Sequence, residues 1–195
     1  MTKYILAGGA IHKALDNGKA FIEELVKDAP NKPVRILICL FAVSKDLWIE
    51  KFEGDQEFFS KFISNFELEL ADEEIFTEQV KKSDVVFIRG GYTKPLIELL
   101  SRDLSWAQEI EGKIIAGTSA GAEAIAKYYH VTKTNRTGTG LGLLNIKFVP
   151  HWESNFFDGE KHNVDWNKIY TDFKNYKEDI ELLTLKDGEF RVIYK

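Results

Sequence analysis

Residues 113–126, KIIAGTSAGAEAIA, join a short apolar run to an alanine-rich stretch through Gly117-Thr118-Ser119-Ala120-Gly121. The apolar run is typical of a buried strand, and the alanine-rich stretch is typical of a helix. The small residues around Ser119 indicate a strand-to-helix turn that is too tight for larger side chains. The stretch therefore predicts an α/β fold with Ser119 at a strand end, either as a reactive hydroxyl or as a plain helix cap.

The same alternation of strand and helix runs along the rest of the chain. Strands are expected at 3–7, 34–41, 84–88, 113–117 and 146–150, and helices at 19–29, 55–66, 72–83 and 94–104. Near-continuous apolar strands separated by helices predict βαβ units and a mostly parallel sheet with helices on both faces, a three-layer α/β/α sandwich. After residue 128 we expect irregular or hairpin structure, then a helix within 164–177 and two short strands around a Lys-Asp-Gly turn within 180–195. No linker or repeat interrupts the chain, so 1–195 is predicted to be one domain.

Composition excludes several classes of protein. The 195 residues carry a net charge of -5, which disfavours a nucleic-acid partner. No apolar window approaches the length of a membrane span, and the single cysteine, Cys39, rules out a disulfide framework and is expected in the core. No cluster of His, Cys, Asp or Glu has metal-ligand spacing, so neither metal nor cofactor is expected. We predict a cytoplasmic protein.

Two loops fit the edge of a parallel sheet at which ligands bind, outside the carboxyl ends of the strands. In 84–96, DVVFIRGGYTKPL, a strand runs into Gly90-Gly91 and then into a helix. Paired glycines let backbone N–H groups turn toward an anion, although an ordinary tight turn explains them equally well. At the second loop, Gly117-x-Ser119-x-Gly121 between a strand and a helix is the nucleophile-elbow pattern, which would direct the Ala120 N–H at a developing oxyanion.

A serine needs a base, and the chain offers four histidines, His12, His130, His151 and His162. His151 directly follows Pro150 at the end of an apolar run, which places it at the same sheet edge as Ser119. In α/β-hydrolases the acid lies between the serine and a late histidine. His151 follows Ser119 too closely for that order, so the pair indicates similar chemistry on another scaffold.

Three segments in this order and spacing, FIRGGYT (87–93), IIAGTSAGA (114–122) and GLGLLNIKFVPHW (140–152), resemble the peptidase E group of serine peptidases, family S51. The group includes aspartyl dipeptidases and cyanophycinases. The resemblance implies a fold like that of class I glutamine amidotransferases, which is flavodoxin-like. It implies Ser119 as nucleophile, His151 as general base, and the N–H groups of Gly91 and Ala120 as the oxyanion hole. Substrate contacts are expected from Gly90, Tyr92 and Thr93, with Tyr92 replacing the asparagine of the family's Gly-Gly-Asn-Thr pattern.

The resemblance leaves two positions open for the third catalytic residue. Some relatives place an aspartate after a Thr-Thr-Asn stretch, where this chain has Thr134-Asn135-Arg136. Cyanophycinase-like relatives use a glutamate in a late strand-turn segment, which corresponds to LKDGEF (185–190). Asp187 matches best by position and Glu189 is the alternative. The plain alternative for Asp187-Gly188 is a hairpin turn.

The function implied is hydrolysis of small peptides, most of all dipeptides with an N-terminal aspartate. A cyanophycinase-like hydrolase and a non-catalytic binding protein of the same fold are the alternatives. An acidic substrate side chain needs a cation, and four lie near the motifs: Arg89, Lys94, Arg136 and Lys161. The expected partners are a small peptide substrate and a second copy of the chain in a homodimer, with no nucleic acid or membrane.

Overall fold

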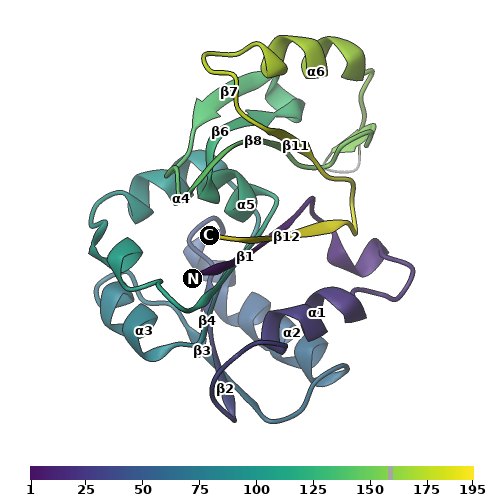
Figure 1. Cartoon of the computed structure of the whole chain (residues 1–195). Coiled ribbons are helices and arrows are strands. Elements are labelled where there is room, and N and C mark those ends of the chain that lie inside the picture. Colours follow the sequence, from purple (N-terminus) through teal and green to yellow (C-terminus); the bar gives the residue numbers. More distant parts are fainter. Residues whose placement is uncertain (158–159) are drawn as a thin grey trace.

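The larger sheet has six strands and forms the middle layer of the fold. The computed structural model describes residues 1–157 and 160–195, and its larger sheet has the order β12-β1-β5-β4-β2-β3 (Figure 1). Strands β1 to β5 are parallel to one another, and β12 pairs antiparallel with β1 at one edge of the sheet. The bounds are β1 Lys3–Ala7, β2 Val34–Cys39, β3 Phe66–Leu70, β4 Val85–Ile88, β5 Ile114–Thr118 and β12 Phe190–Tyr194.

Helices cover both faces of this sheet, which explains why its inner strands are almost entirely apolar. Helices α1 (Lys19–Val26) and α2 (Trp48–Ser60) lie on one face, where Phe21 and Phe59 both pack against Phe87 of β4. Helices α3 (Phe76–Lys82), α4 (Thr93–Leu100) and α5 (Ala120–Ile125) lie on the other face (Figure 1). The prediction of an α/β fold with mostly parallel strands and helices on both sides is confirmed.

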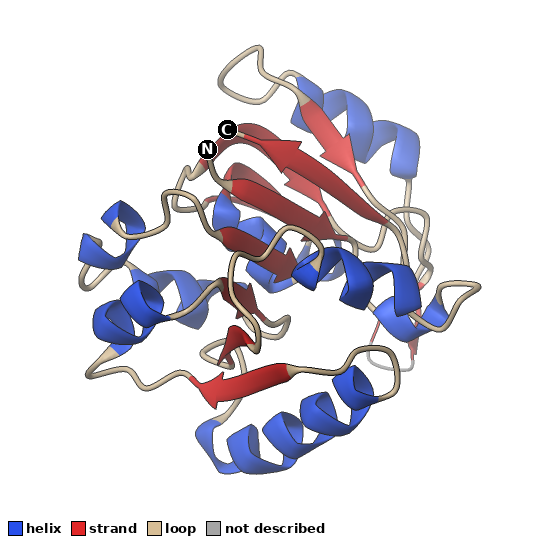
Figure 2. Ribbon diagram, turned by 60° about the horizontal axis from the view of Figure 1, so that its bottom comes forward, coloured by secondary structure: helices blue, strands red, loops and turns tan. Residues whose placement is uncertain are grey.

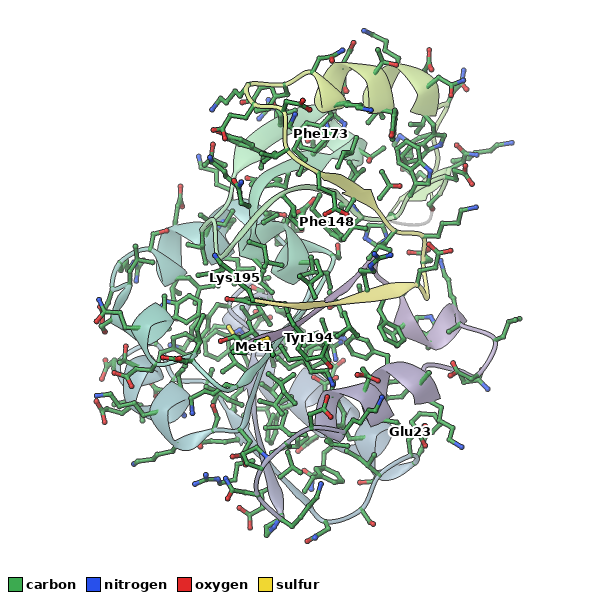
Figure 3. The ribbon with its side chains drawn as sticks, viewed as in Figure 1. Met1, Glu23, Phe148, Phe173, Tyr194 and Lys195 are labelled. Carbon is green, nitrogen blue, oxygen red and sulfur yellow. The ribbon has the colours of Figure 1, made fainter. Side chains whose placement is uncertain are left out.

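A second sheet departs from the single sheet that the sequence predicts. It has four strands in the order β11-β8-β6-β7, and α6 (Trp166–Lys174) covers it. Phe173 projects from α6 into the small core between them (Figure 3). The run expected at 146–150 therefore forms β8 in this second sheet and not a strand of the first. The bounds are β6 Ala126–Val131, β7 Arg136–Thr139, β8 Leu144–Val149 and β11 Leu182–Thr184.

Short elements complete the described chain. Strands β9 (Phe156–Phe157) and β10 (Glu160–Lys161) form a small ribbon. Four 3-10 turns are η1 (Ile11–Lys13), η2 (Lys45–Leu47), η3 (Ser105–Gln108) and η4 (Thr132–Thr134). Figure 2 shows the strands in the interior of the molecule and the helices around them. No helix in the described ranges is long and apolar enough to cross a bilayer.

Three local predictions differ from the structure. Strand β3 was not predicted, because FELEL alternates apolar and acidic residues at a half-exposed sheet edge. The helix expected at 55–66 is α2, which begins and ends earlier, at Trp48 and Ser60. The two C-terminal strands exist but do not pair with each other, since β11 joins β8 in one sheet and β12 joins β1 in the other.

The segment between β11 and β12 joins the two sheets. The Gly8 N–H donates to the Glu189 carbonyl (3.0 Å), the Gly188 N–H to the Gly9 carbonyl (2.9 Å), and the His151 N–H to the Gly8 carbonyl (2.9 Å). These bonds bring the carboxyl ends of β1 and β8 together with the β11–β12 connection, beside the end of β5. We call this region the seam, defined by residues 8–10, 119, 150–151 and 185–189.

Candidate active site

Ser119 occupies a strained turn between β5 and α5. Its backbone has φ 48° and ψ -115°, a conformation that residues other than glycine rarely adopt. A Cβ at Gly117 would lie 2.6 Å from the Ala122 nitrogen, and one at Gly121 would lie 2.0 Å from the Ile88 carbonyl oxygen. Only glycine fits at either position, so the sequence around Ser119 is dictated by the close approach of α5 to the sheet.

His151 extends toward Ser119 from the second sheet, and not from the carboxyl edge of the same sheet as the sequence predicts. It follows Pro150 at the end of β8 and has a left-handed backbone, with φ 53°. The Ser119 hydroxyl lies 2.8 Å from His151 Nε2. A Cβ on Gly9 would lie 2.1 Å from Cε1 of the imidazole. The glycine after β1 therefore leaves the space in which the histidine ring lies.

Asp187 contacts the other side of the imidazole. Its Oδ1 lies 2.6 Å from His151 Nδ1, and its Oδ2 accepts a hydrogen bond of 2.6 Å from the Lys13 ammonium. The hydrogen bond with His151 and then that from Lys13 lower the pKa of Asp187 to about 2, against a partial desolvation that opposes them. Glu189 turns away and accepts from the Lys186 N–H at 2.9 Å, within the same turn. Of the two acids the sequence offers, Asp187 is the one placed against His151.

The two loops expected to bind an oxyanion lie side by side. A Cβ on Gly90 would be 3.1 Å from the Ser119 Cβ, and one on Gly91 would be 2.2 Å from the Ala42 carbonyl oxygen. Gly91 has φ 150°, so this loop requires glycine for both space and conformation. Ala120 is the first residue of α5, where N–H groups have no partner within the helix.

The residues expected to contact substrate differ in their surroundings. Gly90 donates its N–H to Thr118 Oγ1 at 3.1 Å. The Tyr92 side chain is largely exposed, and its N–H donates to the Ala42 carbonyl at 2.8 Å. Thr93 is buried and lines a cavity of about 260 Å³ together with Ser119, His151 and Asp187.

Glu123 is a residue of this cavity that sequence reasoning missed. It lies one helical turn after Ser119 on α5, is 3% exposed, and accepts a short hydrogen bond from the Thr93 hydroxyl. Burial raises the pKa of Glu123 to about 8, partly opposed by that bond. A glutamate four positions after Ser119, among alanines that have no polar atoms to satisfy it, was the available signal.

The four cations proposed for an acidic substrate side chain are not among the residues that line this cavity: Arg89, Lys94, Arg136 and Lys161. Arg89 is ion-paired with Asp55 of α2, and burial lowers its pKa to about 10. Lys94 lies 3.7 Å from Glu98 on α4. Lys13 and Lys133 line the cavity instead. Both come from segments outside the three sequence motifs, which is why motif spacing did not identify them.

Comparisons with known proteins agree with this architecture. The model of peptidase family S51 matches residues 6–194. The fold is similar to a peptidase from an acI-B1 actinobacterium, with a TM-score of 0.73 and 19% identity, covering 99% of this chain and 83% of that one. It is also similar to a protein from Listeria monocytogenes EGD-e described as a "Putative Peptidase E Protein", with a TM-score of 0.67 and 19% identity, covering 100% and 98%. A comparison with curated proteins gave no match.

Proposed function

Since the chain belongs to peptidase family S51 and is a serine-type peptidase, we propose that it hydrolyses short peptides with an N-terminal aspartate, using Ser119, His151 and Asp187. The observation that carries the proposal is the hydrogen-bonded chain of these three side chains, with 2.8 Å between the first pair and 2.6 Å between the second. Such a chain activates a hydroxyl that is otherwise a weak nucleophile.

Each side chain has one task in the proposed mechanism. Ser119 Oγ attacks the scissile carbonyl carbon while His151 Nε2 takes the hydroxyl proton. Asp187 holds the proton on Nδ1 and stabilises the imidazolium that forms. The N–H groups of Gly91 and Ala120 stabilise the oxyanion. His151 then gives its proton to the leaving amine, and a water molecule, deprotonated by the same imidazole, hydrolyses the acyl-enzyme.

The preference for an acidic residue rests on the charges around Ser119. Lys13 and Lys133 line the cavity, Lys13 in an ion pair with Asp187, and their ammonium groups would attract a substrate carboxylate. The cavity volume of about 260 Å³ suits one small side chain.

Two measurements test the proposal. A fluorophosphonate probe is expected to label wild-type protein at Ser119 and not the Ser119→Ala variant; no labelling at Ser119 would overturn the mechanism and favour a binding protein. Rates on Asp-Leu, Asn-Leu, Glu-Leu and β-Asp-Arg then define the substrate. Asn-Leu is the matched control, because it differs from Asp-Leu only in charge, and it should be cleaved far more slowly. Preference for β-Asp-Arg would instead support a cyanophycinase-like hydrolase.

We also propose that the protein works in the cytoplasm as one domain and forms a homodimer. Cys39, the only cysteine of the sequence, is buried in β2, and burial raises the pKa of its thiol to about 12. An inert thiol without a disulfide partner suits a reducing compartment. Sedimentation of the purified protein gives its oligomeric state.

A further inference from the structure

A second cavity adjoins the one around Ser119. It has a volume of about 500 Å³ and is lined by residues of α6, of the β6–β7 hairpin and of the η4 turn. Figure 1 shows α6, β6 and β7 at the top of the molecule. Thr132 and Lys133 line both cavities, so the η4 turn borders both. Phe173 and Tyr176 form an aromatic wall of the second cavity.

Two polar side chains in the wall of this cavity have no hydrogen-bond partner among the described residues. His130 is 4% exposed, and neither of its ring nitrogens forms a hydrogen bond there; the same is true of the buried Thr132 hydroxyl. His130 is in β6 and Thr132 is the first residue of the η4 turn, and both line this cavity. Buried polar groups without partners are rare and destabilising, which indicates that something else satisfies them.

The chemistry of the two groups defines what would satisfy them. Burial lowers the pKa of His130, so its imidazole is neutral and offers one donor and one acceptor. A hydroxyl offers both as well. A peptide group presents the complementary pair, a carbonyl acceptor and an N–H donor. The aromatic wall adds an apolar surface for a side chain.

The position relative to His151 defines which part of a substrate would reach the cavity. The imidazole of a serine peptidase delivers its proton to the leaving amine, so the leaving group lies on the histidine side of the serine. His151 and Thr132 both line the Ser119 cavity, and Thr132 also lines the second cavity. A leaving group that extends from His151 along this shared wall would reach the second cavity.

We propose that the cavity is a subsite for the leaving part of a peptide longer than two residues, whose backbone hydrogen-bonds with His130 and Thr132. This inference rests on the proposed function. It adds a preference for peptides of three or more residues over dipeptides, because the residues after the scissile bond would pass the η4 turn and enter the cavity.

The kinetic test compares Asp-Ala with Asp-Ala-Ala and Asp-Ala-Ala-Ala. In the wild type, kcat/KM should be at least about tenfold higher for the longer peptides, mainly through KM. In His130→Phe, which removes both nitrogens and keeps a ring, that ratio should fall by about fivefold or more. His12→Phe is the matched control, because His12 is exposed and lies outside the cavity; its ratio should equal that of the wild type. An unchanged ratio in His130→Phe overturns the inference.

A binding test separates this inference from the proposed function. Ala-Ala-Ala is titrated into the Ser119→Ala variant while the His130 ring nitrogens are followed by NMR. Saturable shifts of these nitrogens are expected, whether or not Asp-peptides are cleaved, and the ring nitrogens of His12, which lies outside the cavity, should not shift. Thr132→Val, which loses the hydroxyl at nearly constant volume, should weaken binding in the same assay. Cleavage of Asp-Ala without any shift of His130 up to about 10 mM tripeptide would mean that only water satisfies these groups, and would overturn the subsite alone.

Discussion

The Asp187 carboxylate lies between the His151 imidazole and the Lys13 ammonium. Because its pKa is lowered to about 2, mainly by the hydrogen bond with His151, the group is ionised at any working pH. Asp187→Asn should favour the tautomer with the proton on Nε2, which cannot accept the Ser119 proton. We expect kcat to fall by up to about 10⁴-fold. Tm should also fall, because the lowered pKa means that the folded protein stabilises the ionised carboxylate.

Glu189→Gln is the matched control for Asp187→Asn, because among the described contacts the Glu189 side chain hydrogen-bonds only with the turn backbone, at the Lys186 N–H. Its kcat should stay near that of the wild type. Near wild-type rates for both acid variants, beside an inactive Ser119→Ala, would mean that serine and histidine work as a dyad.

The contribution of Glu123 to the free energy of unfolding should depend on pH. Burial raises its pKa from 4.5 to about 8, so between these pH values the folded protein binds a proton that the unfolded chain has lost. The free energy of unfolding therefore decreases as pH rises through this window and levels off above it. Glu123→Gln does not titrate and keeps an acceptor for the Thr93 hydroxyl. Its stability relative to the wild type should increase between about pH 5 and about pH 8, by on the order of 3 kcal/mol.

Denaturant unfolding at several pH values measures this difference, with Glu123→Ala as the comparison. The alanine variant loses the bond to Thr93 and leaves a cavity, so it should be less stable than Glu123→Gln throughout. A difference between Glu123→Gln and wild type that does not vary with pH would contradict the protonated carboxyl.

The position of a site residue could be predicted from the sequence where its motif is compatible with only one local backbone geometry. Ser119 follows from glycines that only a tight strand-to-helix turn requires, and His151 from its place at a strand end. The choice between Asp187 and Glu189 stayed open, because two positions in one turn point to different neighbours and local sequence does not say which. Lys13 was not predictable, since its contact with Asp187 joins the two ends of the chain.

At the scale of elements, α5 depends on its close contact with β4. A Cβ on Gly121 would lie 2.0 Å from the Ile88 carbonyl oxygen, whereas a Cβ on Gly54 in α2 would meet nothing within 4 Å. Gly121→Ala should therefore lower stability by about 1–3 kcal/mol and reduce labelling of Ser119, because α5 is pushed from the sheet. Gly54→Ala should raise stability by about 0.5–1 kcal/mol, as expected for a helix interior.

Chemical denaturation of the two alanine variants checks this prediction. Both substitutions are made in helices and add the same methyl group, so the difference between them isolates the contact with β4. Equal stability for the two variants would contradict the packing of α5 described above.

Elements were predictable where burial on both faces makes a strand continuously apolar, as in β1, β2, β4 and β5. Strand β6 alternates buried and half-buried residues and lies on the smaller sheet, and its sequence, AKYYHV, gave no such signal. The partners of β11 and β12 could not be predicted, because strand pairing across two sheets is decided by distant parts of the chain.

At the scale of the whole molecule, the site forms where the two sheets meet. Ser119 comes from the larger sheet, His151 from the smaller, and Asp187 from the segment that connects them. The termini are tied together by two bonds between Thr2 and Lys195, so the last strand is fixed beside the first (Figure 1). The two-sheet arrangement therefore determines the distance between the serine and the histidine, which no single element could do.

Within the seam, Gly9 lies directly against the His151 ring. Gly9 (φ 122°) would place a Cβ 2.1 Å from the His151 ring, whereas Gly112 (φ 75°) would place one in open space. Both have left-handed backbones, so alanine should cost each variant about 1 kcal/mol of stability. Only Gly9→Ala should displace the imidazole from Ser119, and a shift of about 1 Å is expected to lower kcat by about 10²-fold. Rates and Tm values of the two variants separate backbone strain from displacement of the ring. Equal activity in Gly9→Ala and Gly112→Ala would mean that the glycine after β1 does not set the position of His151. The backbone of the seam would then move to accommodate the added methyl group.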